Sequence, residues 1–306
     1  ISIITGFVSV PLTINYLGVE RYGLWMTIIS FTMALKFADL GLGNGLINTL
    51  SKTFGTNDRE EAKKAVSSVF FILLAVASFL LIIFSLFYTS LPWGSIFNVR
   101  TEIAINESGP SAAVFFICFI LNIPIGIVQR IQRGYQEGYI FNLWETVGNI
   151  LSLVALLFAI YFKLGLPLLI LAIAGIPIIV RSINMFFQFF YVRKWIKPRL
   201  GLFDIQIAKR LLNTGIVFTI ITLANILGSS VDNIIIAQYM GASFVTEYSI
   251  VQKLYSILFI VTFITAPFWP AFGEAFALAD YSWAQRAFYK IQLLSFWVTI
   301  MICLPL

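Results

Sequence analysis

Two cations and a carboxylate lie deep in apolar segments and are the side chains best suited to hold a charged molecule. Lys36 and Asp39 lie three residues apart in an otherwise apolar stretch. Arg181 lies twelve residues, or roughly 18 Å of helix, before the basic cluster that begins at Arg193. Because a guanidinium fork matches phosphate geometry, we predict that Lys36 and Arg181 bind an anion. Asp39 would orient that anion or exchange a proton.

Each of these charges also has a simpler partner within the chain. Residues three apart share a helix face, so Lys36 and Asp39 can neutralise each other. Arg181 can pair with Glu145 or with Asp39 instead of with a ligand. The sequence leaves both alternatives open, because a charge at membrane depth needs a partner in either case.

Polar side chains recur at intervals of three, four and seven residues along most of the apolar segments. This spacing places them on one helix face, which is typical of helices that line a water-filled cavity. Ser, Thr and Asn also join membrane helices directly, and for any single helix that explanation is as good. We predict a cavity lined by Asn122, Gln129, Glu145, Asn149, Asn184, Gln188 and Asn225.

Two further charged residues complete the predicted site. Arg133 is expected at the inner mouth of the cavity as a third substrate-binding cation, although membrane topology alone also explains its position. Asp232 joins Asp39 as a candidate for ion coupling. No catalytic residue, metal site or cofactor is predicted, since the chain has no histidine and its two cysteines are isolated in apolar runs.

The elements that must position these residues are apolar segments. The chain of 306 residues is 59% hydrophobic and 11% charged, well beyond what a soluble domain of this length needs for its core. Crossing a bilayer takes about 20 residues. We predict an all-α polytopic membrane protein with about nine transmembrane helices, of which the first and last are truncated. They are expected at residues 1–16, 22–50, 65–91, 110–132, 140–162, 166–192, 209–239, 248–272 and 289–306.

Lysine and arginine are distributed unevenly between the two sides of these segments. Most of the 20 cations fall in alternate connections, whereas the opposite connections hold only Arg21, Arg100 and Lys163. Since cytoplasmic loops carry the excess of Lys and Arg, the first set is predicted to be cytoplasmic. The net charge of +6 therefore reports membrane topology and does not indicate binding to nucleic acid.

Two hairpins of the sequence resemble each other. YLG at 16–18 corresponds to YMG at 239–241, and ERY at 20–22 corresponds to TEY at 246–248 after a short insertion. Such repeats commonly enclose a transport site near the middle of the membrane. We therefore predict a pseudo-two-fold transporter with three parts: an N-terminal six-helix lobe at 1–192, a cytoplasmic linker at 193–208 and an incomplete C-terminal lobe at 209–306.

Short motifs along the whole chain resemble one family of exporters. They are PLTINYLGVERYGLW from Pro11 to Trp25, DLGLGNG from Asp39 to Gly45, the charged DREEAKK that follows, and PFWPA from Pro267 to Ala271. Together they resemble Wzx-type O-antigen and capsule repeat-unit flippases of the multidrug/oligosaccharidyl-lipid/polysaccharide superfamily.

The resemblance implies a bacterial cytoplasmic-membrane protein of twelve to fourteen helices. Its cargo would be an undecaprenyl-diphosphate-linked oligosaccharide, moved to the outer leaflet by alternating access. Its partners would be that lipid-linked cargo, the bilayer and a polysaccharide polymerase, with no nucleic acid. The cationic central cavity of the family fits Lys36 and Arg181.

Other functions remain to be compared with this one. A lipid II-type flippase would share the superfamily and much of the chemistry. A multidrug exporter of organic cations would favour acidic groups in its cavity, which disagrees with two deep cations. A membrane glycosyltransferase or polymerase would need solvent-exposed acids or bases, yet the largest outer connection offers only Arg100, Glu102 and Glu107.

Overall fold

The computed structural model describes residues 2–34, 41–229, 231–259, 261, 265 and 280–304. Among these residues every regular element is a helix and none forms a β-strand, which confirms the predicted all-α class. The chain divides into two compact units, Ile1–Thr246 and Glu247–Leu306.

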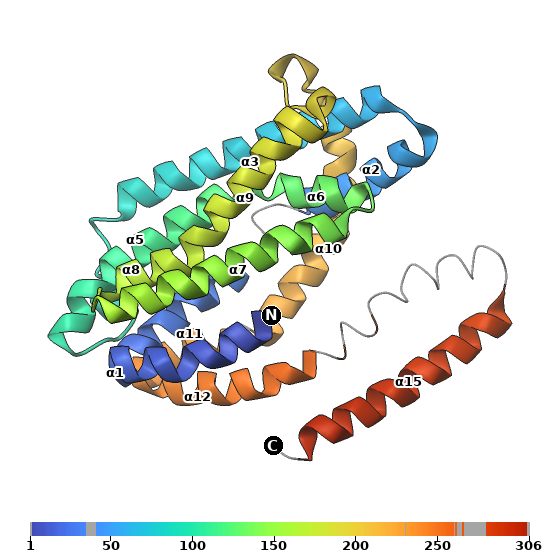
Figure 1. Ribbon diagram of the computed structural model, residues 1–306. Helices are drawn as coiled ribbons and strands as arrows, with labels where there is room; N and C mark the ends of the chain where they lie inside the picture. The colour runs from blue at the N-terminus through green and yellow to red at the C-terminus, as the bar shows by residue number, and fades with distance from the viewer. Residues whose placement is uncertain are drawn as a thin grey trace. The chain divides into compact units, whose positions relative to one another are not determined.

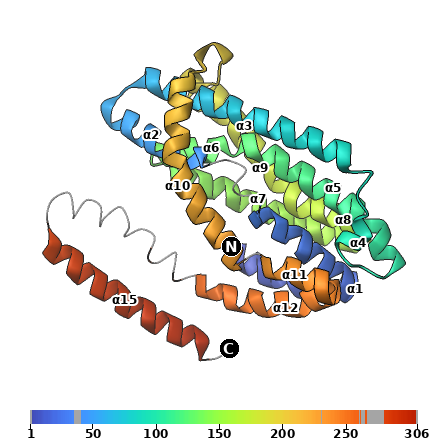
Figure 2. The ribbon, with the colours of Figure 1, turned by 180° about the vertical axis from the view of Figure 1, so that it is seen from behind.

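The first unit holds most of the helices, and α3, α5, α9 and α7 lie next to one another in it (Figure 1, Figure 2). Its elements are α1 (Ser2–Ala34), α2 (Leu42–Thr56), α3 (Arg59–Phe87), α4 (Trp93–Ile96), α5 (Glu102–Ile125), α6 (Ile127–Gly134), α7 (Gly138–Tyr161), α8 (Leu166–Ile170), η2 (Leu171–Gly175), α9 (Ile176–Phe187), η3 (Gln188–Val192), η4 (Lys194–Ile196), η5 (Leu200–Leu202), α10 (Ile205–Ser229) and α11 (Val231–Met240). The chain continues through α12 (Ala242–Tyr255) into the second unit, which holds η6 (Ser256–Phe259) and α15 (Tyr281–Cys303).

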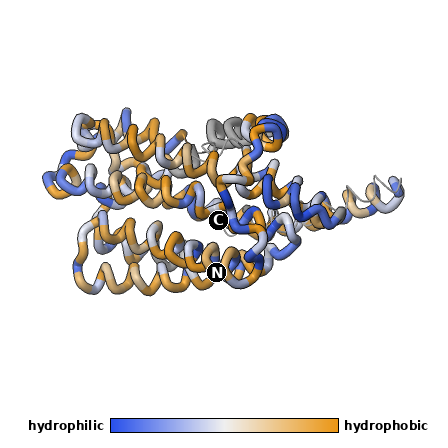
Figure 3. Tube along the Cα trace, turned by 90° about the horizontal axis from the view of Figure 1, so that it is seen from above, coloured by the Kyte–Doolittle hydropathy of each residue, from blue (hydrophilic) through white to orange (hydrophobic). Residues whose placement is uncertain are grey.

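Four helical segments of the described chain are long and apolar enough to cross a membrane. They are Arg59–Phe87, Glu102–Gly134, Gly138–Tyr161 and Leu166–Val192. They correspond to four of the predicted spans, and Figure 3 shows that the long helices are mainly hydrophobic along their length. Only 17% of the most apolar stretch of α3 is buried, as expected for a helix that faces lipid. The chain is thus a polytopic membrane protein.

The other predicted spans are mainly helical where the structure describes them, with Gly41 at a positive φ of 70° as an exception. α1 covers the predicted segment 1–16 and bends at Gly18 into the segment 22–50, of which residues 35–40 lie outside the described part. The segment 209–239 is covered by α10 and α11.

Six helices begin earlier than predicted, namely α3, α5, α7, α10, α12 and α15. The predicted starts at 65 and 289 are replaced by those of α3 and α15, because an aspartate caps each first turn. Asp58 accepts a hydrogen bond from the Glu61 N–H, and Asp280 accepts one from the Trp283 N–H, each at 3.0 Å. α5 begins at Glu102 and not at 110. Hydropathy locates the part of a helix within hydrocarbon, whereas caps determine where the helix begins.

The two similar hairpins share an unusual backbone conformation. Gly18 has a φ of 76° and Gly241 a φ of 102°, and they occupy corresponding positions in the repeat. Only glycine adopts positive φ without steric cost. The hairpins also touch, since the Thr246 hydroxyl donates to the Val19 carbonyl at 2.6 Å. The internal similarity therefore extends to the backbone, while the division into lobes stays a prediction.

The connections predicted to lie outside the membrane meet at one end of the first unit. Arg21 forms a two-pronged ion pair with Glu107 at 2.6 and 2.7 Å, and Glu107 also accepts the Leu166 N–H at 3.1 Å. The Tyr16 hydroxyl donates to the Leu164 carbonyl at 2.6 Å. These contacts hold α1, α5 and the connection before α8 together.

The connections predicted to be cytoplasmic also contact one another. The Ser68 hydroxyl accepts the Asp204 N–H at 2.8 Å and donates to the Asp204 carbonyl at 3.2 Å. The Arg59 guanidinium lies 5.4 Å from the centre of the Trp195 ring. The long connection after η3 is therefore fixed to the start of α3, and it places the first turn of α10.

Candidate functional site

A polar cluster joins α5, α7 and α9 inside the first unit. The Arg181 guanidinium forms two parallel hydrogen bonds with the Glu145 carboxylate, with Nε 2.5 Å from Oε1 and Nη2 2.8 Å from Oε2. Its Nη1 donates to Asn122 Oδ1 at 2.8 Å. Of the two internal partners that the sequence left open for Arg181, the structure shows Glu145.

This cluster lies well inside the membrane-spanning segments. Arg181 is twelve residues before Arg193, and Asn122 is twelve residues before Gly134, so each lies roughly 18 Å from the inner end of its segment. The side chains of Arg181 and Glu145 are each 24% exposed. Charges at this depth face a partner or a water-filled space. The ion pair is therefore neutralised internally, and both side chains remain partly exposed.

The helix that carries Arg181 is framed by two wide turns, the π-helical elements η2 and η3. Pro177 follows the first one by two residues. A π-helical hydrogen bond to the Ala172 carbonyl needs the N–H of the residue five positions later, and proline has none. The Ser152 hydroxyl donates to that carbonyl instead, at 3.0 Å. Since a π-turn rotates everything that follows it, this feature sets the direction in which Arg181 points.

A second polar pair lies about one turn nearer to the inner end. Gln132 and Asn184 each donate to the other, over 2.9 and 3.2 Å, and each is 1% exposed. Gln188 follows one turn later on the same face and is 2% exposed, and its Nε2 has no hydrogen-bond partner within the described residues. Amide groups therefore continue the polar face of α9 from Arg181 toward the inner side.

The inner end of this face is closed by another arginine pair. Arg193 Nη1 and Nη2 each lie 2.7 Å from a carboxylate oxygen of Glu137, and the guanidinium stacks on the Tyr135 ring at 4.4 Å. Arg133 is exposed nearby in sequence, with its guanidinium 5.4 Å from the centre of the Phe141 ring. The positively charged group of Arg133 therefore remains available to an anion at the predicted inner mouth.

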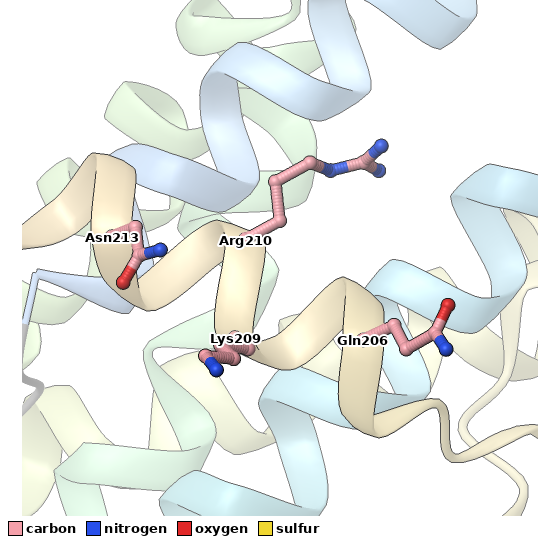
Figure 4. Close-up of a pocket in the computed structure, with 4 residues that line it drawn as sticks. All are labelled: Gln206, Lys209, Arg210 and Asn213. Atoms are coloured by element: carbon pink, nitrogen blue, oxygen red, sulfur yellow. The ribbon is translucent and has the colours of Figure 1, made fainter.

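A polar pocket of about 520 Å³ lies at the start of α10, on the predicted inner side. It is lined by Gln206, Lys209, Arg210 and Asn213, and Figure 4 shows Lys209 and Arg210 pointing away from each other. Arg210 pairs with Glu61 of α3. Lys209 is exposed and makes no ion pair with any residue that the structure describes. The pocket thus offers one uncommitted cation and two amides.

The remaining predicted residues are not brought into this cluster by the described contacts. Lys36 and Asp39 lie outside the described residues, and so does the side chain of Asn225. Gln129 and Asn149 are half-buried on α6 and α7. Asp232 lies in the first turn of α11. In the described part of the chain no group of His, Cys, Asp and Glu side chains is arranged to hold a metal ion.

Sequence reasoning missed two features of the site. Gln132 was not named, because it lies between Arg130 and Arg133 in a segment that resembles a solvated inner loop. Lys209 was counted only among the cytoplasmic cations, and Gln206 and Asn213 were not named, although the spacing of three and four residues places all three on one helix face.

The fold is that of a membrane transporter. A structure of a multidrug resistance MATE family transporter of the MOP superfamily, in an inward-facing conformation, matches 99% of this chain and 68% of its own with a TM-score of 0.73. The sequence identity of 17% limits this likeness to the fold.

The chain belongs to the family of polysaccharide biosynthesis proteins, which it matches over residues 1–276. It is 25% identical over 280 residues to a Salmonella typhi protein named as an O-antigen transporter, covering 87% of this chain and 60% of that protein. It is also 25% identical over 303 residues to a Yersinia pseudotuberculosis protein named as an O-antigen export protein, covering 95% and 65%. The chain therefore spans 60 to 65% of the length of these relatives, which are transport proteins and not enzymes.

Proposed function

We propose that the protein to which this chain belongs moves a polyprenyl-diphosphate-linked oligosaccharide across the bacterial cytoplasmic membrane. The cargo would be an O-antigen or capsule repeat unit, which cannot cross hydrocarbon because its diphosphate and its sugars are polar. A cavity with fixed cations accepts the head group while the polyprenyl chain remains in lipid.

The observation that carries this proposal is the position of Arg181. Its guanidinium lies deep in an all-helical membrane bundle, is partly exposed, and is presented as a fork to paired oxygen acceptors. The same fork suits two oxygens of a phosphate. A cavity built for organic cations would instead favour acidic groups, so this feature supports an anionic cargo over a multidrug exporter.

The other charged residues fit a path from the inner side to this position. Lys209 and Arg133 would attract the diphosphate at the inner mouth, and Lys36 and Arg181 would hold it inside. Asn122, Gln129, Glu145, Asn149, Asn184, Gln188 and Asn225 would line the cavity. Asp39 and Asp232 remain candidates for ion coupling, and the lobes at 1–192 and 209–306 would alternate access. A polysaccharide polymerase would receive the product.

The test is to delete the full-length gene in its host and to measure lipid-linked sugars by mass spectrometry. We expect polyprenyl-diphosphate oligosaccharide to accumulate and surface glycan to disappear. The wild-type gene should restore the glycan, and so should the control Lys194→Gln, which removes an exposed cation of the linker. Arg181→Gln should not. Unchanged lipid-linked sugars with an intact surface would reject the proposal and favour a multidrug exporter.

A further inference from the structure

The described residues of the first unit form three two-pronged arginine–glutamate pairs at three different depths. Arg21 and Glu107 lie at the predicted outer end, Arg193 and Glu137 lie at the inner end, and Arg181 and Glu145 lie between them. The same chemistry in three positions allows the role of the middle pair to be separated from that of a structural ion pair.

The Arg21–Glu107 and Arg193–Glu137 pairs, at the two ends, each have an additional contact that ties separate elements together. Glu107 also accepts the Leu166 N–H at 3.1 Å, and Arg193 also stacks on Tyr135 at 4.4 Å. These contacts fix connections at the two membrane surfaces. Both pairs therefore resemble structural clamps.

The middle pair differs from the other two in its depth, and, as in the inner pair, its additional contact is made by the arginine. Asn122 holds the third donor of Arg181 at 2.8 Å, so the fork stays oriented even without Glu145. Within the described residues, Arg181 is the only side chain that donates a hydrogen bond to the Glu145 carboxylate. The Glu145 carboxylate can therefore move away from Arg181 without breaking any other hydrogen bond, while the Arg181 guanidinium keeps its position.

We propose that Glu145 is a built-in substitute for the cargo's phosphate, and that it competes with the diphosphate for Arg181. This inference rests on the proposed function. In the empty carrier Glu145 neutralises Arg181, which avoids the high cost of an unpaired charge at membrane depth. When a diphosphate arrives, its oxygens replace those of Glu145 on the same fork, and Asn122 acts as a positioning residue.

The experiment measures binding of inorganic pyrophosphate to the purified full-length protein by isothermal titration calorimetry. Glu145→Gln keeps the shape of the side chain and removes the competing charge. We expect it to bind pyrophosphate about tenfold more tightly than the wild type, a change of about 1.4 kcal/mol. Glu107→Gln and Glu137→Gln are the matched controls and should bind as the wild type does. The gain should vanish in the double variant Arg181→Gln with Glu145→Gln.

Glu145→Asp provides a second measurement. Because it retains the negative charge, this variant disturbs folding less than Glu145→Gln does. It keeps the charge but shortens the reach of the carboxylate, and we expect an increase in affinity of about threefold, or roughly 0.65 kcal/mol. Equal or weaker binding by both Glu145 variants would overturn the inference, and so would an absence of pyrophosphate binding in all proteins. The proposed function is judged separately, because the lipid analysis of the deletion strain does not depend on Glu145.

Discussion

Gln132 and Asn184 exchange two hydrogen bonds across the interface of α6 and α9, over 2.9 and 3.2 Å, with both side chains 1% exposed. A reciprocal amide pair satisfies a donor and an acceptor on each side chain. Since no water reaches these atoms, each amide depends on the other. The pair therefore fixes the rotation of α9 below Arg181.

Replacing one member of this pair should cost more than replacing both. Asn184→Leu leaves the Gln132 amide buried without a partner, and we expect a loss of about 1–3 kcal/mol in the free energy of unfolding. Gln132→Leu combined with Asn184→Leu should recover part of that loss, because no orphaned amide remains. A double-mutant cycle on the purified protein measures the coupling. Strictly additive losses would show that the two amides are energetically independent.

Arg181→Lys tests whether the fork matters in addition to the charge. Lysine keeps the cation but cannot hold two oxygens and Asn122 in one plane. Losing charged hydrogen bonds costs about 1.5–3 kcal/mol, so we expect surface glycan to appear at least about tenfold more slowly. The measurement is the rate of glycan display in the complemented deletion strain. Lys194→Arg is the control, and equal rates for both variants would mean that charge alone suffices.

The sequence singled out three deep polar residues that the structure brings into contact. Arg181, Glu145 and Asn122 stand out because charges and amides are rare in apolar segments of this length. Helical spacing places each of them on the polar face of its own helix, and the structure brings the three side chains together.

The choice of partner for Arg181 was beyond the sequence. Whether Glu145 or Asp39 contacts it depends on the rotation of α9, and that rotation follows from the π-helical turn η2. The turn is contacted from another helix, where the Ser152 hydroxyl donates to the Ala172 carbonyl. A contact between residues far apart in the chain leaves no periodic signal, so hydropathy and spacing do not detect it.

Ser152→Ala should destabilise the π-turn that orients Arg181. The substitution removes the donor to the Ala172 carbonyl, and a buried unsatisfied carbonyl costs about 1–3 kcal/mol. We expect a lower thermal unfolding temperature of the purified protein and weaker transport. Ser182→Ala is the control, because the Ser182 hydroxyl donates only to Ile178 one turn away, at 2.8 Å. Similar effects of the two substitutions would argue against a special role for Ser152.

Asp204 should make the start of α10 sensitive to acid. Its carboxylate accepts the Ile207 N–H at 3.2 Å and the Gln206 N–H at 3.0 Å, and Lys64 lies 3.8 Å away. The hydrogen bond from Ile207 makes the largest contribution to lowering the pKa of Asp204 below its ordinary value of 3.8. Because the folded-state pKa is depressed, this contribution is present above pH 3.8 and is lost as the pH falls through the folded-state value.

Asp204→Asn should therefore separate the contribution of the negative charge from that of the hydrogen bonds that cap α10. Asparagine also accepts hydrogen bonds at a helix start, so the variant should fold, but it has no charge to lose in acid. We expect the unfolding temperature of the wild type to exceed that of the variant near pH 6 and the difference to shrink as the pH falls below about 4. Thermal unfolding of the purified protein at several pH values measures this difference. Parallel curves for the two proteins would show that the Asp204 carboxylate does not contribute to stability through its charge.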